Sequence, residues 1–197
     1  AFDNSVHSFL GCVECHMDLM DEDPWGHDPD LAPVDCSMCH GEAQELYDES
    51  LHAYALERGN ERAPDCAGCH GAHNILPSSE EDSRTNRANL VDMCASCHGT
   101  AGLLTDSLVR LPQAVKGYAQ SVHGQAFARG MDTAAICSDC HGIHNLKGVL
   151  DPESMIHPYN VSATCGKCHN DIQSQYDRSI HGRALMAGIQ DSPTCND

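Results

Sequence analysis

The most regular pattern of apolar and polar positions in this chain is a six-residue signature that occurs four times. It reads aromatic-x-x-Ser-aliphatic-His and occupies residues 2–7, 47–52, 118–123 and 176–181. Its aromatic and aliphatic residues lie four positions apart, so that both face one side of an α-helix with the histidine beside them. The signature therefore predicts helices that present an apolar face and a histidine together.

The sequence predicts four helices, three of which contain a signature. Gly59, Gly130 and Gly188 follow three of them, where glycine commonly ends a helix. The segments 21–33 and 76–87 are polar and rich in Pro or Glu, as is typical of connections. The helices are expected at residues 43–58, 104–111, 116–129 and 171–187.

A second motif, Cys-x-x-Cys-His, occurs six times and identifies the candidate chemistry. In c-type haem attachment, two thiols add to the two vinyl groups of one haem, and the adjacent histidine becomes the proximal iron ligand. Six motifs predict six covalent haems, about one for every 33 residues. The attaching cysteines are expected to be Cys12, Cys15, Cys36, Cys39, Cys66, Cys69, Cys94, Cys97, Cys137, Cys140, Cys165 and Cys168, and the proximal histidines His16, His40, His70, His98, His141 and His169.

Structural zinc is the alternative interpretation of these cysteine pairs, because six motifs would combine into three four-ligand sites. Zinc does not explain why a histidine follows every second cysteine. A thioredoxin-like redox motif would occur once, between a strand and a helix. Haem attachment is therefore favoured, and zinc is kept as the alternative.

Composition agrees with a cofactor-rich protein. Twelve of the thirteen cysteines lie in the motifs and only Cys195 is left, so no disulfide framework is expected. Aromatic residues make up 5% of the chain, with three Phe and one Trp, which is little for a conventional core. Haems would supply the missing hydrophobic mass, and the chain without haem is expected to be poorly folded.

The formal net charge is −18 at pH 7. It argues against nucleic acid or anionic lipid as a partner and favours basic partners, although a simple solvated acidic surface explains it equally well. No stretch of 18 apolar residues is present, so no membrane span is expected. Because c-type haem is attached outside the cytoplasm, the mature chain is expected to have lost a signal peptide.

Eight histidines remain outside the motifs, enough to give every iron a second axial histidine. His157 is the weakest candidate, because Asn86 takes its place in the parallel unit. The methionines show no repeated spacing and are interpreted as packing residues. The expected distal ligands are His52, His73, His123, His144 and His181, with His27 or His7 for the first haem; His27 is preferred, because the signature of His7 elsewhere belongs with an earlier haem.

His73 and His144 each lie three residues after a proximal histidine. The two axial nitrogens of one iron are on opposite faces of the porphyrin, roughly 4 Å apart if each bond is about 2 Å. Three residues of chain cannot pass around the ring, so each of these histidines must bind a different haem from its own motif. Close spacing of the haems follows.

The spacings describe one array over residues 1–197 built from repeats. Two-haem units are expected at about 36–93 and 94–164, with partial units at 1–35 and 165–197 and a 13-residue insertion within 103–117. Cys195 aligns with Cys137, so the native polypeptide is expected to continue with Cys-His and a seventh haem. Contact of the chain ends with haems of neighbouring subunits is the alternative.

These residues resemble the multihaem c-type cytochromes of respiratory electron transfer, most clearly at residues 118–124 and 136–144. The resemblance implies a mainly α, haem-organised fold with extensive loops, little or no β-sheet, and bis-histidine haems stacked in parallel and perpendicular pairs. It also implies a periplasmic or extracellular location.

The leading functional hypothesis is an electron carrier or conduit, with redox proteins such as a membrane quinol-oxidising module as partners and no catalytic residue. The first alternative is a multihaem reductase with one open haem. The second is a subunit of a conductive filament, in which identical neighbouring subunits share end ligands.

Overall fold

The computed structural model of the chain describes residues 2–20, 31–99, 113–189 and 191–197. Helices and loops make up this described part, and no strand occurs within it. The expected mainly α fold with extensive loops is confirmed. The elements are η1 Phe2–Asn4, α1 Cys12–Cys15, η2 Met17–Leu19, α2 Ser37–Asp48, α3 Leu51–Glu57, α4 Cys66–His70, α5 Arg87–His98, α6 Ala114–Gln120, α7 Val122–Ala128, α8 Cys137–His141, α9 Pro158–Gly166, α10 Asn170–Arg178 and α11 Ile180–Met186.

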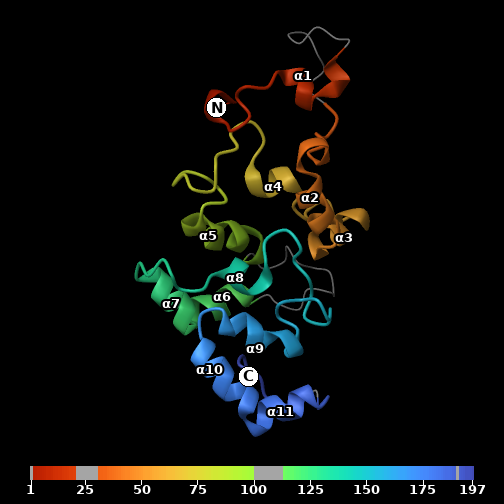
Figure 1. The fold of residues 1–197 in the computed structure, drawn as a ribbon. Coiled ribbons are helices and arrows are strands. Elements are labelled where there is room, and N and C mark those ends of the chain that lie inside the picture. Colours follow the sequence, from red (N-terminus) through yellow and green to blue (C-terminus); the bar gives the residue numbers. More distant parts are fainter. Residues whose placement is uncertain (1, 21–30, 100–112, 190) are drawn as a thin grey trace.

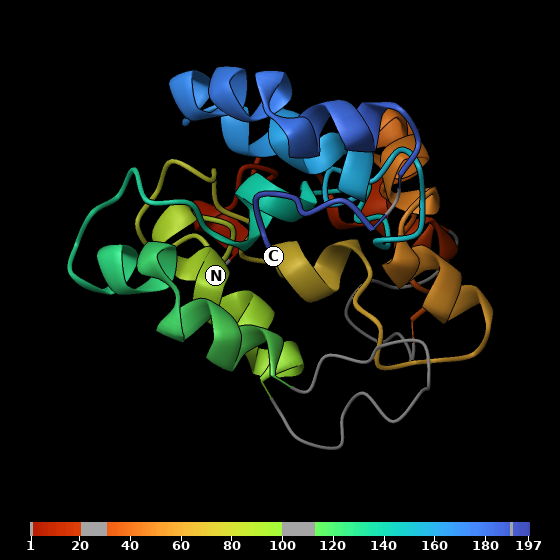
Figure 2. The ribbon, with the colours of Figure 1, turned by 90° about the horizontal axis from the view of Figure 1, so that it is seen from below.

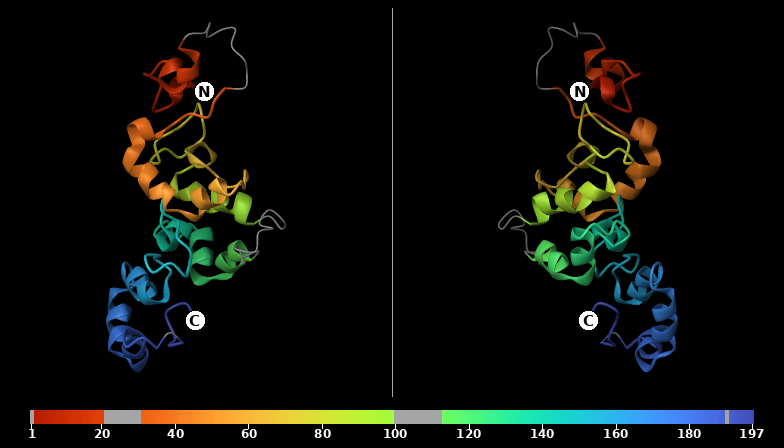
Figure 3. Two further views of the ribbon diagram at one scale, coloured as in Figure 1. Left: turned by 90° about the vertical axis from the view of Figure 1, so that its right-hand side faces the viewer. Right: turned by 90° about the vertical axis from the view of Figure 1, so that its left-hand side faces the viewer.

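The helices follow one another along an elongated molecule. Helix α1 lies near one end, α5 and α8 lie in the middle, and α10 and α11 lie at the other end (Figures 1 and 3). Viewed from below, they are spread around the long axis rather than gathered about a common centre (Figure 2). Most contacts between helices join successive elements, such as α9 with α10 and α6 with α7. The fold is therefore nearly one-dimensional, as in repeat proteins.

Each predicted helix that contains a signature is broken at the signature serine, so continuous helices at 43–58, 116–129 and 171–187 are wrong. Ser50, Ser121 and Ser179 adopt extended ψ angles of 158°, 163° and 168°. Each side-chain hydroxyl accepts a hydrogen bond from an amide of the following helix and so caps it. The expected helix at 104–111 lies outside the described residues.

The glycine stop signals are confirmed. Gly59, Gly130 and Gly188 have φ angles of 83°, 87° and 91°, which side chains with a Cβ rarely adopt. At the first of them, the Gly59 amide donates to the Leu56 carbonyl and the Asn60 amide to the Ala55 carbonyl. These paired bonds close the end of α3.

The signature tyrosines join their helices to later cysteines, of which Cys66 and Cys137 begin a Cys-x-x-Cys-His motif and Cys195 does not. Each hydroxyl donates to the backbone carbonyl two residues before a cysteine, namely Tyr47 to Pro64 at 2.9 Å, Tyr118 to Ala135 at 3.1 Å and Tyr176 to Pro193 at 2.8 Å. The aromatic residue thus fixes the position of a cysteine 19 residues away in the sequence.

The polypeptide forms only a small core of its own. Its buried apolar side chains in the described part are Leu19, Ala53, Ala134, Ile136, Val161 and Leu185. The accessible surface is 13,781 Å², whereas a compact protein of this mass exposes roughly 9,000 Å². Large apolar side chains that a packed domain would cover, including Leu46, Met38 and Ile143, are exposed. This exposed apolar surface agrees with haems as the missing hydrophobic mass.

Ser50→Ala is expected to destabilise the protein by about 1 kcal/mol, because a capping hydroxyl is lost. Ser50 is 1% exposed and its Oγ accepts from the Ala53 amide at 3.1 Å. Thermal unfolding followed by circular dichroism measures the effect. Ser174→Ala, at a half-buried position inside α10 where the serine caps no helix, is the matched control and should leave the midpoint unchanged. Equal midpoints for the two variants would contradict the capping role.

Candidate haem centres

The third and fifth motifs are single helical turns. Helices α4 and α8 place two cysteines three positions apart and a histidine one position later, so the three side chains project from one side of the turn. Gly71 and Gly142 end these turns with φ angles of 84° and 82°. This backbone directs the chain into the short loop that carries the next histidine.

Ten histidines form five facing pairs of nearly constant separation. Each pair combines one motif histidine with one histidine from outside the motifs. The ring centroids are separated by 5.9 Å in His7–His40, 6.1 Å in His16–His73, 6.1 Å in His52–His98, 6.2 Å in His70–His144 and 6.0 Å in His123–His169.

This separation fits an iron between two imidazoles. Two metal–nitrogen bonds of about 2 Å, with about 1 Å from each nitrogen to its ring centre, give roughly 6 Å between trans rings. The ten histidines come from loops, helix ends and motif turns, yet all five pairs keep this distance. The residues present therefore fit bis-histidine haem, which would be held covalently by the neighbouring cysteines.

Residues 6–99, which hold the first four Cys-x-x-Cys-His motifs, match a family model described as cytochrome c3. The chain is a multihaem c-type cytochrome. No curated protein and no solved structure matches it significantly. A zinc protein would bring three or more ligands together, and no such cluster occurs among the described residues of this cytochrome.

The pairs in the cytochrome connect different repeats. His73 faces His16 and His144 faces His70, so both histidines are directed to a motif other than their own. His52 and His123 face His98 and His169, each 46 residues later in the chain.

The first motif and the His7 signature differ from the sequence expectation. His73, rather than His27 or His7, lies opposite His16, and His7 lies opposite His40. The signature histidines thus face a later motif and not an earlier one. The repeated 46-residue spacing of His52–His98 and His123–His169 was visible in the sequence and was a signal for this direction, whereas His7 and His40 are 33 residues apart.

Four other histidines remain. His27 lies outside the described residues. His157 caps α9, where its Nδ1 accepts from the Tyr159 amide at 3.4 Å, and its ring packs on Tyr159. Within the described part, no aromatic ring faces His141 or His181.

The first cysteines of successive motifs are neighbours. The thiols of Cys36 and Cys66 lie close enough to influence each other, as do those of Cys94 and Cys137. Burial raises the pKa of the Cys36 thiol to about 11, with Cys66 adding to the shift. Cys165 is in the same relation to Cys195. Haems attached at neighbouring motifs would therefore lie side by side.

Burial also keeps candidate ligands in the form that binds iron. It lowers the pKa of His52 and of His70, and the nearby His98 and His144 add to the respective shifts. A neutral imidazole is the ligating species, so these environments favour coordination.

Polar contacts connect the repeats around the motifs. Arg87 donates to Asp139 at 2.8 Å and to the Ala134 carbonyl at 2.8 Å, which joins α5 to the turn of α8. Lys147 pairs with Glu49 at 2.9 Å and with Glu153.

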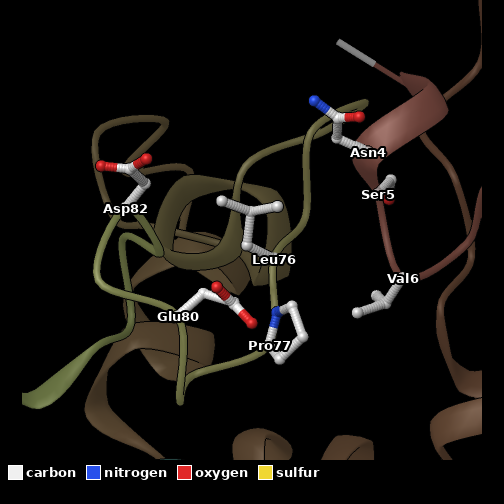
Figure 4. A pocket seen from close by; sticks show the side chains of 7 residues that line it. All are labelled: Asn4, Ser5, Val6, Leu76, Pro77, Glu80 and Asp82. Carbon is white, nitrogen blue, oxygen red and sulfur yellow. The ribbon is translucent and has the colours of Figure 1, made fainter.

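A pocket of about 470 Å³ lies between the first signature and the loop 76–82, and Figure 4 shows Val6 and Pro77 on its two sides. None of the described helices is both long and apolar enough to cross a membrane.

Proposed function

We propose that this cytochrome carries electrons through six covalent c-type haems arranged in the order of their motifs. Electron transfer is the activity expected of a cytochrome of this family. The observation that carries the six-haem proposal is the set of five histidine pairs at 5.9–6.2 Å, each beside one of the six motifs.

The arrangement of the motifs supports a conduit. Thiol contacts join the second motif to the third and the fourth to the fifth, and the motifs succeed each other along the long axis (Figure 1). Electron tunnelling slows steeply with distance, so adjacent haems favour transfer from one to the next. The units at about 36–93 and 94–164 then form one array with the partial units at 1–35 and 165–197.

The location and partners follow from the cofactor and the charge. Covalent haem attachment outside the cytoplasm favours a periplasmic or extracellular protein. The net charge of −18 favours redox partners with basic docking surfaces, between a donor such as a quinol-oxidising membrane module and a terminal acceptor. The five histidine pairs would leave no open coordination position at their irons, which favours a carrier over an enzyme.

A multihaem reductase with one open haem is the second candidate. It is favoured by one observation, namely that no described histidine faces His141. The surroundings of His141 favour a different role for this residue, as a docking face for a further histidine loop.

Intact mass and iron content test the proposal. The purified chain is expected to exceed its polypeptide mass of 21.3 kDa by six haems and to contain six irons. A Cys165→Ala/Cys168→Ala variant, as control, should lose one haem and keep five. Zinc in place of iron, or fewer than six haems in the parent chain, would contradict the proposal.

A further inference from the structure

Two loops of identical pattern, at residues 70–75 and 141–146, dock onto earlier repeats in the same way. The first loop places His73 opposite His16 at 6.1 Å. Two residues later, the Ile75 carbonyl accepts a hydrogen bond from the Val6 amide at 2.8 Å. One receiving face therefore consists of a motif histidine and the backbone amide of the aliphatic signature residue.

The second loop repeats both contacts. His144 faces His70 at 6.2 Å, and the Leu146 carbonyl accepts from the Leu51 amide at 2.9 Å. The ion pair of Lys147 with Glu49 adds a further bond between loop and signature. The two docked loops thus define a general rule, in which a His-x-aliphatic segment binds the motif histidine and the signature amide of the preceding repeat.

A third receiving face is present without a loop on it. Its two elements are His141, the histidine of the fifth motif, and Val122, the aliphatic residue of the third signature. Within the described part of the chain, no aromatic ring faces His141 and no group accepts a hydrogen bond from the Val122 amide. Val122 is 77% exposed, compared with 38% for Val6 and 51% for Leu51.

The serines that precede these aliphatic residues differ in exposure in the same way. Ser5 and Ser50, which precede Val6 and Leu51, are 5% and 1% exposed. Ser121, which precedes Val122, is not buried. The docked loops cover the first two positions, and the third has the same residues and backbone without such a cover.

The histidines left in the described part have other places in the repeat. His157 caps its own helix and packs on Tyr159. His181 belongs to the fourth signature, and signature histidines face the first motif of the following unit, as His52 faces His98. A second copy of the chain also has its two loops engaged internally. No histidine loop of the described residues is therefore left for this face.

We propose that His141 and Val122 form a docking face for a His-x-aliphatic loop supplied by a polypeptide segment outside residues 1–197, of the same haem-repeat class as the loops at 70–75 and 141–146. The histidine of that loop provides the second axial ligand to the haem held by Cys137, Cys140 and His141. Its aliphatic residue accepts the hydrogen bond of the Val122 amide. This inference rests on the proposed function, because it requires that haem.

The haem-loaded chain of residues 1–197 provides the test. Its electron paramagnetic resonance spectrum is expected to show five low-spin irons and one high-spin iron, and added imidazole should convert the high-spin iron to low spin. A synthetic peptide with the sequence of residues 142–149, which carries His144 and Leu146, should do the same at lower concentration than imidazole, since it makes the additional backbone contact.

Val122→Pro separates the two contacts. Proline removes the amide donor, and it is tolerated at the first position of a helix after an extended residue, as Ser121 is with ψ 163°. The variant should bind imidazole like the parent and require about five-fold more peptide for half conversion, as expected for one lost hydrogen bond. Ile180→Pro, at the equivalent position of the fourth signature, is the matched control and should leave peptide binding unchanged.

Several results would overturn this assignment. Six low-spin irons in a monomeric chain, unaffected by imidazole, would mean that one of its own histidines is already the second ligand of the haem at His141. A high-spin signal created by His27→Ala, His157→Ala or His181→Ala would identify that histidine. Six low-spin irons in a sedimenting dimer would assign the ligand to a second copy. If Val122→Pro bound the peptide as tightly as the parent chain, the proposed contact of the Val122 amide would be wrong. Each of these leaves the six-haem carrier intact, whereas absence of haem would reject the proposed function itself.

Discussion

His73→Ala is expected to open the haem attached at Cys12 and Cys15, and to leave the haem beside His73 six-coordinate. The reason is the pairing of His73 with His16, 57 residues earlier in the sequence, at 6.1 Å. Loss of the distal imidazole leaves His16 as the sole axial protein ligand. Covalent attachment through the cysteines should persist, so haem content should not change.

Electron paramagnetic resonance should record one additional high-spin iron, and carbon monoxide should bind the reduced variant at one additional haem. His144→Ala provides the parallel case and should open the haem at Cys66 and Cys69 instead, since His144 faces His70. His157→Ala is the control, because that histidine caps a helix. If His73→Ala instead opened the haem of its own motif, or opened none, the crossed pairing would be wrong.

The second large effect concerns folding. The chain produced without haem attachment is expected to lose most of its helical circular dichroism and its cooperative thermal transition. Its buried apolar side chains in the described part are few, and many large apolar ones are exposed. Helices of seven residues, such as α3 and α7, are too short to persist alone in water.

Comparison of the haem-loaded and haem-free chains at equal concentration provides the measurement. Partial loading is an informative intermediate, because contacts run mainly between successive elements. A Cys12→Ala/Cys15→Ala variant should lose order near its first repeat and retain it near α9 to α11. A haem-free chain with the full helical signal and a sharp transition would show that the polypeptide core is sufficient.

The motif chemistry and the helical class could be predicted from the sequence because both are local. Cysteine spacing, the four-residue spacing within the signatures, and the terminal glycines each depend on a few adjacent residues. The helix breaks at Ser50, Ser121 and Ser179 were missed, although serine is a preferred N-cap residue, because the apolar pattern continues across the break.

The pairing of the histidines was harder to predict from the sequence, because it joins residues that are far apart in the chain. That His73 must face away from its own motif followed from chain length alone. Which motif it faces depends on how the repeats stack, and the stacking rests on contacts such as Val6 to Ile75 and Tyr47 to Pro64. His27 was preferred to His7 for the first motif because the signature of His7 was expected to belong with an earlier haem, whereas His73 faces that motif.

The crossing of histidines between repeats has a consequence for the order in which the protein matures. During synthesis and export, the motif of His16 emerges well before His73, and the motif of His70 well before His144. A haem attached at His16 or His70 during export would therefore have its proximal histidine before its partner histidine has emerged. The iron at His40 would already have His7, so the haems at His16 and His70 would be the ones exposed to small competing ligands and to oxidation in a growing chain.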